Sequence, residues 1–285
     1  MPIELHERLS EFSYGYGVTR EVERRLKASG LSAVPFLPNL IQEASVGFDV
    51  AFNVQGMPLM IQFKLGQAMR RFKPSPRPRL SQQFWRYRVD TAEPDGQFEL
   101  LLKAELDGAR VFYVAPRFHD WEVYLGHYEQ KKILRRSLIV TPKAIRSVLD
   151  NNGVPDGEHM VVYDDQRAYL CSTPLQLPAV READIAEKVR FDLEHRKVSL
   201  GEALEEVLTG FERRTEIRRA GERRHQDPDR GAYGIPSDDG RGAALRRSRL
   251  ARFQASGRSR AEAVALVVGA ETWSVGAQLI FVTRQ

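Results

Sequence analysis

The amino-acid sequence predicts a mixed α/β (α+β) fold, in which short strands alternate with helices, followed by a helical, charged C-terminal extension. Alternating or continuous apolar runs bounded by turn residues indicate strands. These runs are 47–54, 59–65, 110–115, 159–163 and 167–171. Helical apolar spacing marks 20–29, 98–106 and 119–136. Hydrophobic residues make up 42% of the chain and charged residues 28%, as in an ordinary globular protein.

The first helix is predicted to follow a turn. Ser13–Gly17 reads SYGYG and is typical of a turn-like lead-in. Thr19 is then a suitable N-cap for a helix over 20–29, with Gly30 as its stop. Two prolines within 33–40 predict an extended, edge-like segment. Residues 138–141 predict a short strand or a turn.

Changes in composition along the chain divide it into four parts. Residues 1–180 are the expected domain, and 181–225 form a charged helical segment. Residues 226–242 are rich in Gly, Pro and Asp, as flexible linkers are. Residues 243–285 are expected to be a small unit that packs back on the domain. Its apolar stretch contains Glu271, which favours a buried helix and strand over a membrane anchor.

Composition limits the classes of function. The single cysteine, Cys171, excludes an internal disulfide, and the N-terminus has no apolar signal region, so a cytoplasmic location is expected. The net charge of +5 permits a polyanionic partner. There is no Gly-rich phosphate loop and no dinucleotide fingerprint, which argues against an ATP-driven motor or a nicotinamide enzyme.

Two neighbouring segments carry the residues that suggest chemistry. A hairpin is predicted between 47–54 and 59–65, with Gln55-Gly56-Met57-Pro58 as its turn. Residues two apart on a strand point to the same face, so Gln62 and Lys64 would point together, with Asp49 on the paired strand beside them. An acid, an amide oxygen and a lysine in one pocket suit hydrolysis of a phosphodiester around a divalent cation.

The residues Gly47-Phe48-Asp49-Val50 and Leu59-Met60-Ile61-Gln62-Phe63-Lys64 resemble the PD-(D/E)xK superfamily, which includes many restriction enzymes. The stretch from Tyr16 to Lys64 is similar to an uncharacterised bacterial subgroup with a Gln-x-Lys motif. The resemblance implies a restriction-endonuclease-like αβββαβ core with a mixed central sheet. It covers 50–100 residues and explains nothing after residue 180. Gln62 departs from the acidic residue of the usual motif and is a weaker, neutral ligand.

The resemblance also implies roles for individual residues. Asp49 would be a direct metal ligand, Gln62 would add an oxygen, and Lys64 would position the attacking water. The family often draws another carboxylate from the preceding helix. Glu23 is favoured over Glu21 for this role, and Glu43 is a third candidate.

Two basic segments are candidate nucleic-acid contacts. The proline-rich loop 70–79 carries five cations and no acid, and 241–260 carries seven arginines and no acid. The candidates are Arg70, Arg71, Lys73, Arg77, Arg79, Arg246, Arg247 and Arg249. A solvated loop and a solvated helix face are the alternative interpretations.

The sequence therefore predicts a Mg²⁺- or Mn²⁺-dependent nuclease, with DNA favoured over RNA and a setting in genome defence, such as antiviral defence, or repair. The alternative is a catalytically inactive restriction-endonuclease-like module that binds nucleic acid or protein. A plain solvated strand face that happens to carry these residues is the third interpretation. A homodimer or a partner protein is left open, and no membrane contact is expected.

Overall fold

The computed structural model describes the backbone of residues 3–5 and residues 9–36, 50–71, 78–93, 96–171, 174–212 and 241–284. Its helices are α1 (Glu11–Ala28), α2 (Gln97–Leu106), α3 (Trp121–Glu129), the 3₁₀ helix η2 (Leu134–Arg136), α4 (Pro142–Asn151), α5 (Asp184–His195), α6 (Leu200–Glu212), α8 (Arg241–Ala255) and α9 (Arg260–Ser274). Its strands are β1 (Ile3–Leu5), β2 (Leu31–Pro35), β3 (Gly56–Phe63), β4 (Gln67–Arg70), β5 (Gln83–Asp90), β6 (Arg110–Pro116), β7 (Ser137–Val140), β8 (Glu158–Tyr163), β9 (Ala168–Leu170), β10 (Leu175–Gln176) and β11 (Ala277–Arg284). The mixed α/β class that the sequence predicts is confirmed.

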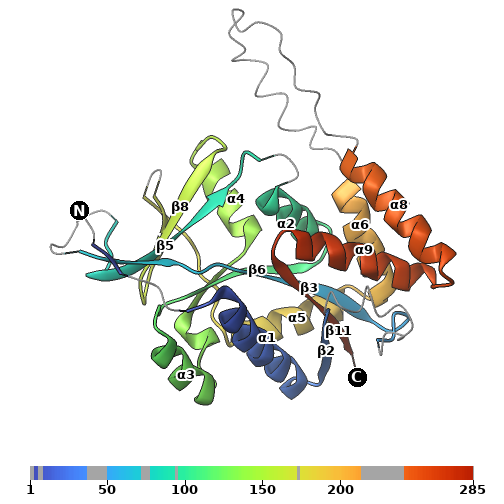
Figure 1. The fold of residues 1–285 in the computed structure, drawn as a ribbon, viewed down its shortest axis with the longest axis horizontal. Coiled ribbons are helices and arrows are strands. Elements are labelled where there is room, and N and C mark those ends of the chain that lie inside the picture. The colour runs from blue at the N-terminus through green and yellow to red at the C-terminus, as the bar shows by residue number, and fades with distance from the viewer. Residues whose placement is uncertain are drawn as a thin grey trace, which may run out of the picture.

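The centre of the fold is a mixed five-stranded sheet in the order β2-β11-β3-β6-β7. β11 runs antiparallel to both β2 and β3, whereas β3 and β6 are parallel. Every residue of β3 is buried, because helices cover both faces of the sheet. α1 and α5 lie on one face, and α2, α6 and α9 lie on the other (Figure 1).

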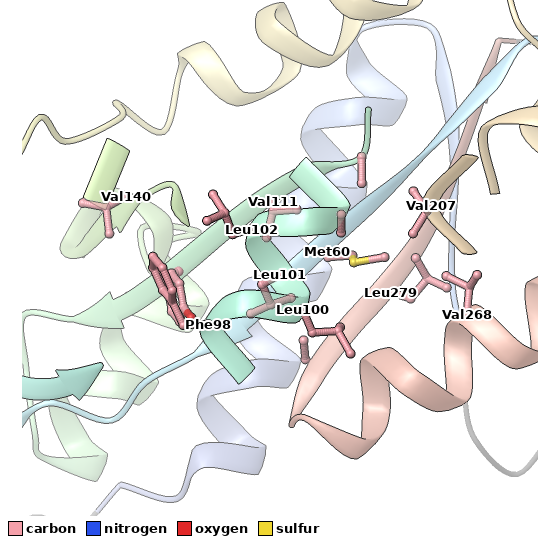
Figure 2. Packing of buried hydrophobic residues seen from close by; sticks show 14 of the residues in the cluster. Met60, Phe98, Leu100, Leu101, Leu102, Val111, Val140, Val207, Val268 and Leu279 are labelled. Carbon is pink, nitrogen blue, oxygen red and sulfur yellow. The ribbon is translucent and has the colours of Figure 1, made fainter. Parts of the chain in front are cut away.

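The two sides of β3 belong to two separate hydrophobic cores. Leu59, Ile61 and Phe63 pack with α1, whereas Met60 packs with α2, α6 and α9. Figure 2 shows the larger core, where Met60 lies among side chains of α2, α9 and β11. The large core accounts for the apolar runs that predicted α2 and β6 from the sequence.

A second sheet of six strands, in the order β1-β4-β5-β8-β9-β10, is antiparallel throughout. Trp85 and Tyr163 stack on its inner side and join the larger core. The predicted hairpin of 159–163 and 167–171 is confirmed as β8 and β9. The hydroxyl of Tyr163 donates to the carbonyl of Pro116, which ties this sheet to the end of β6.

The predicted hairpin of 47–54 and 59–65 is wrong in the part that the structure describes. Residues 50–54 form no strand, and Gly56 to Pro58, expected as the turn, begin β3. The antiparallel neighbour of β3 is β11, which lies more than two hundred residues further along the chain. Pro58 is tolerated because β6 pairs with β3 only from Leu59 onward.

The helix predicted to begin at residue 20 begins at Glu11 and includes the SYGYG segment. Ser10 caps it by accepting a hydrogen bond from the N–H of Ser13. The glycines stand where other elements approach closely. A Cβ on Gly15 would lie 2.8 Å from the ring of Phe63, and one on Gly17 would lie 2.4 Å from Ile133. Close packing, rather than a turn, explains these two glycines.

The C-terminal segment completes the central sheet. The helix and strand predicted within 264–282 are confirmed as α9 and β11. Because β11 lies between β2 and β3, residues 1–180 alone do not complete the sheet. Glu271 is buried on α9 and pairs with Arg246 and Arg249 of α8. Among the described helices, none combines the length and apolar character needed to cross a membrane.

Candidate active site

Lys64 directly follows β3 and lies at the end of the sheet where the parallel strands β3 and β6 finish. Its N–H donates to the carbonyl of Val114 at 3.0 Å, which fixes the backbone there. Burial lowers the pKa of the Lys64 ammonium group, the carboxylate of Glu11 raises it, and the charge of Arg88 lowers it further. Lys64 is thus a partly buried cation whose pKa is raised by the charge of Glu11.

Glu11 stands in the first turn of α1, which β3 holds in place. The ring of Tyr14 packs edge-on against Phe63 at a centroid distance of 6.2 Å, and Gly15 lies against the same ring. Burial raises the pKa of the Glu11 carboxyl group, and the charge of Lys64 opposes this shift. The packing of α1 on the last residue of β3 therefore brings an acid and a lysine to one place.

Gln62 is only 2% exposed and lies on the Met60 face of β3. Its Nε2 donates to the carbonyl of Phe63 at 2.9 Å, and its Oε1 has no hydrogen-bond partner in the described part of the chain. The neighbouring Tyr113, in register with Gln62 on β6, has a buried hydroxyl that finds no partner among the residues the structure describes, and so does Tyr87. Unsatisfied buried polar atoms are rare and commonly mark a bound water or ion.

The glutamates that the sequence favoured are occupied elsewhere. Glu21 is 4% exposed and accepts hydrogen bonds from the N–H groups of Ile133 and Leu134, at 2.8 and 3.2 Å. It caps η2 on the α1 side of the sheet, opposite the face of Gln62. Glu23 is partly exposed and pairs with Lys27 at 3.7 Å. Among the helix acids described, Glu11 is the one whose charge raises the pKa of Lys64.

Asp49 and Glu43 lie outside the described residues. The segment just after Asp49 is held by the start of α6, where Gly201 N–H donates to the carbonyl of Phe52 at 2.8 Å. This is the Gly56 end of β3. At about 3.3 Å per residue, the eight residues of β3 put that end about 25 Å from Lys64. The predicted hairpin therefore does not bring the described segment after Asp49 close to Lys64.

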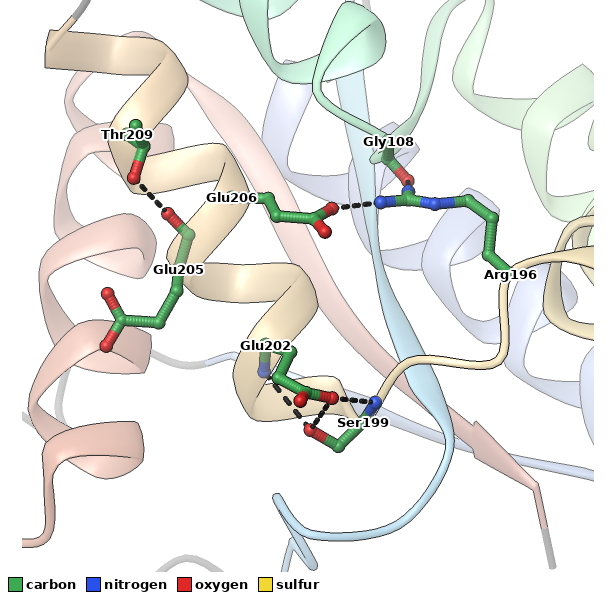
Figure 3. A network of polar contacts seen from close by, with 7 residues as sticks. All are labelled: Gly108, Arg196, Ser199, Glu202, Glu205, Glu206 and Thr209. Atoms are coloured by element: carbon green, nitrogen blue, oxygen red, sulfur yellow. Dashed lines mark hydrogen bonds and ion pairs between the residues drawn. The ribbon is translucent and has the colours of Figure 1, made fainter.

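A cavity of about 830 Å³ lies beside residues 50–53, and the glutamates on its rim are already paired. Glu202 accepts from the backbone and hydroxyl of Ser199, and Glu206 pairs with Arg196 (Figure 3). Glu205 pairs with Arg260 at 2.5 Å. These acids stabilise the start of α6 and its contact with α9, and they are not free ligands.

Some arginines of the basic loop are exposed, and others contact neighbouring residues. Arg70 and Arg79 are exposed. Arg71 lies over the ring of Phe84 at 4.7 Å and donates to the carbonyl of Pro78. Lys73 and Arg77 lie outside the described residues.

The basic C-terminal helix α8 likewise has some arginines in ion pairs and others exposed to solvent. Arg246 is 7% exposed, pairs with Glu271 at 3.2 Å, and donates to the carbonyl of Phe211. Arg249 pairs with Glu271 at 2.8 Å, and only Arg247 of the three predicted contacts is exposed. Arg246 therefore anchors α8 to α9 and α6, so its guanidinium does not face solvent as a nucleic-acid contact requires.

Sequence reasoning missed Glu11 because SYGYG was taken for a turn. The signal was present in the sequence: Ser10 is a good N-cap, and an acid directly after it is favoured in the first turn of a helix. In the described residues, no group of three His, Cys, Asp or Glu side chains gathers as a metal site. Comparison of the chain with protein-family models, with curated proteins and with solved structures found no match in any of the three.

Proposed function

We propose that this protein is a metal-dependent nuclease of the PD-(D/E)xK type, with a Gln-x-Lys motif, that hydrolyses phosphodiester bonds in nucleic acid, DNA in preference to RNA. One observation carries the proposal. The charge of Glu11 raises the pKa of Lys64 where β3 and β6 finish, and Lys64 stands two residues along the chain from a buried Gln62 oxygen that has no partner among the described residues. Perturbed titratable groups gathered at the carboxyl ends of parallel strands are typical of active sites.

The oxygen donors at this place suit a hard divalent cation. Gln62 Oε1 would be one oxygen ligand of Mg²⁺ or Mn²⁺ on the Met60 face of β3, and Asp49, which the resemblance assigns as a ligand, lies outside the described residues. When bound, the ion would lower the pKa of a water molecule and offset charge on the phosphate. A shell with few protein carboxylates fits Mg²⁺, which keeps several of its waters.

In this proposal Lys64 is the residue that acts on the phosphate. Its ammonium group lies in a partly buried setting, where a charge acts more strongly than it would in water. It would donate hydrogen bonds to the attacking water and to a non-bridging oxygen of the phosphate. The carboxylate of Glu11 would favour the protonated form of Lys64 by raising its pKa. Exposed Arg70, Arg79 and Arg247 would contact flanking phosphates.

The test is cleavage of plasmid DNA, single-stranded DNA and RNA with Mg²⁺ or Mn²⁺. We expect Lys64→Ala and Glu11→Gln each to reduce the rate by about 100-fold or more, as loss of one preorganised charge does. Asp49→Ala tests the ligand that the resemblance assigns. Glu23→Gln is the matched control, because it removes a carboxylate from the same helix, and should stay within about twofold of the wild type.

Cleavage that persists in both Lys64→Ala and Glu11→Gln would remove this site from the mechanism. A second candidate function rests on Gln62, which replaces the usual acid. In that case the chain is an inactive nucleic-acid- or protein-binding module. Absence of cleavage and of Mn²⁺ binding by calorimetry, together with salt-sensitive DNA binding, would favour it.

A further inference from the structure

A second cavity, of about 380 Å³, opens just beyond the end of β6 and belongs to no site described so far. Its size lies within the ordinary range for small-ligand pockets, roughly 300–1,000 Å³. The lining comes from four places in the fold: the residue after β6, η2, the turn between β8 and β9, and the segment that joins β10 to α5. The charged lining residues are Arg117, Arg135, Arg167, Arg181 and Glu182.

Arg117 is held in place by carbonyl groups rather than by an acid. Its Nε donates to the carbonyl of Asp164 at 2.9 Å, and its Nη1 donates to the carbonyl of Ser137 at 2.8 Å. Carbonyl groups orient a guanidinium but leave its charge unbalanced. Burial lowers the pKa of Arg117, with the nearby Asp165 opposing that shift most strongly among the charges. The remaining nitrogen, Nη2, has no partner in the described part of the chain.

The rest of the lining is also short of negative charge. Within the described residues, neither Arg135 nor Arg167 has a carboxylate at ion-pair distance. Arg181 pairs with Asp184 at 2.8 Å, and Glu182 pairs with Arg25 at 4.0 Å.

Asp164, in the turn between β8 and β9, is already committed to the backbone. The carboxylate of Asp164 accepts hydrogen bonds from the N–H groups of Ser81, Gln166 and Arg167. It therefore closes the turn between the strands instead of neutralising Arg117. Three guanidinium groups thus line one small cavity, with Glu182 in its described lining and Asp165 beside Arg117 as the opposing acids, and this excess of positive charge favours a compact dianion.

We propose that this cavity binds the phosphate group of a phosphomonoester, with Arg117 as the fixed anchor and Arg135 and Arg167 as its partners. The neutral polar side chains of Gln166 and Gln176 line the same cavity and can accept hydrogen bonds from the rest of the ligand. The phosphate belongs either to a free nucleotide or to the phosphorylated end of a nucleic-acid strand. The proposal does not depend on the nuclease activity proposed above.

The test is isothermal titration calorimetry on the full chain at constant ionic strength. The probes are inorganic phosphate, adenosine monophosphate, and one short oligonucleotide with either a 5′-phosphate or a 5′-hydroxyl end. We expect the phosphate-bearing probes to bind and the 5′-hydroxyl oligonucleotide to bind at least tenfold more weakly than its phosphorylated form. Adenosine monophosphate binding as tightly as the phosphorylated oligonucleotide indicates a nucleotide ligand, and tighter binding of the oligonucleotide indicates a strand end.

Variants locate the binding. Arg117→Met, and separately Arg167→Gln and Arg135→Gln, should each weaken binding about tenfold or more. Arg135 is exposed and Arg167 half-buried, so these two variants keep the test valid if Arg117→Met does not fold. Arg146→Gln on α4 is the control, since it removes the same charge outside the cavity. Failure of all phosphate-bearing probes to bind, or equal binding by the three cavity variants and the wild type, would overturn the proposal.

Discussion

Glu11 and Lys64 carry charges that the fold disfavours, Lys64 in a partly buried position and Glu11 in the exposed first turn of α1. Burial raises the pKa of Glu11 above 4.5 and lowers the pKa of Lys64 below 10.5. In both cases the fold disfavours the charged form, and the attraction between the two charges offsets this only in part. Groups kept in an unfavourable environment are characteristic of sites selected for function rather than for stability.

This leads to a prediction for Glu11→Gln. Between pH 4.5 and the raised pKa of Glu11, the folded chain binds more protons at Glu11 than the unfolded chain does. The free energy of unfolding therefore falls as pH rises through this window. We expect Glu11→Gln to be more stable than the wild type at pH 7, and the difference to vanish below about pH 4.5. Urea denaturation at pH 4, 5.5 and 7 measures it.

Glu202→Gln is the control with the opposite sign. The backbone N–H and hydroxyl of Ser199 lower the pKa of Glu202 (Figure 3), so its stabilising contribution is present above pH 4.5 and is lost as pH falls. This variant should be less stable than the wild type at pH 7. Equal stability of Glu11→Gln and the wild type at pH 7 would show that Glu11 is not strained by its surroundings.

At the scale of the element, the position of α1 decides where the carboxylate of Glu11 lies relative to Lys64. The helix packs on β3 through Gly15 and on α3 through Gly17, and Tyr124 of α3 donates its hydroxyl to the carbonyl of Ser13 at 2.6 Å. These contacts fix the first turn and therefore the position of Glu11. Small residues on α1 thus serve the site by allowing close approach, although each lowers helix propensity.

We predict that Gly17→Ala destabilises the chain. The new Cβ would lie 2.4 Å from Ile133 and 2.9 Å from the Tyr124 hydroxyl, and overpacking of this kind costs about 1–3 kcal/mol. The gain in helix propensity, about 1 kcal/mol, does not offset the upper part of that range. Gly126→Ala on α3 is the matched control, because nothing lies within 4 Å of its added Cβ, and it should be neutral or stabilising. A urea midpoint for Gly17→Ala at or above that of the control would contradict the packing account.

Local patterns predicted the elements whose evidence is local. The apolar runs of α2, β6 and the β8–β9 hairpin, and the helix and strand at the C-terminus, could be read from periodicity. The partner of β3 could not, because β11 is far away in sequence and pairing between distant segments leaves no local mark. Spacing singled out Lys64 and Gln62 as candidates, whereas Glu11 was not singled out because glycines that serve packing resemble those of a turn.

At the scale of the whole molecule, the C-terminal segment joins the first strands of the chain. β11 pairs with β2 from Leu31 to Pro35 and with β3 from Gly56 to Gln62. Its apolar side chains enter both cores, Phe281 on one face and Ile280 on the other. Without β11, β2 has no neighbour in the sheet and the Gly276 turn beside Gln62 is lost. The candidate active site therefore depends on both ends of the described chain.

The arrangement also places both proposed sites at one edge of the central sheet. Lys64 follows β3 and Arg117 follows β6, and these two strands are parallel neighbours. Ligands of open α/β sheets commonly bind outside the carboxyl ends of such strands. The two sites are separate in their residues, so the variants that test one leave the other intact.

Because β11 is a central strand, we predict that residues 1–212 do not fold cooperatively on their own. A fragment that lacks β11 exposes the inner edges of β2 and β3 and loses a strand that is buried on both faces. The free energy lost with that strand exceeds the roughly 5–15 kcal/mol by which a typical domain is stable. Adding a second fragment, residues 241–285, should restore a cooperative thermal transition, measured by circular dichroism with the full chain as reference. A cooperative transition from residues 1–212 alone would mean that the first part of the chain is an independent domain and that β11 only adds to a finished sheet.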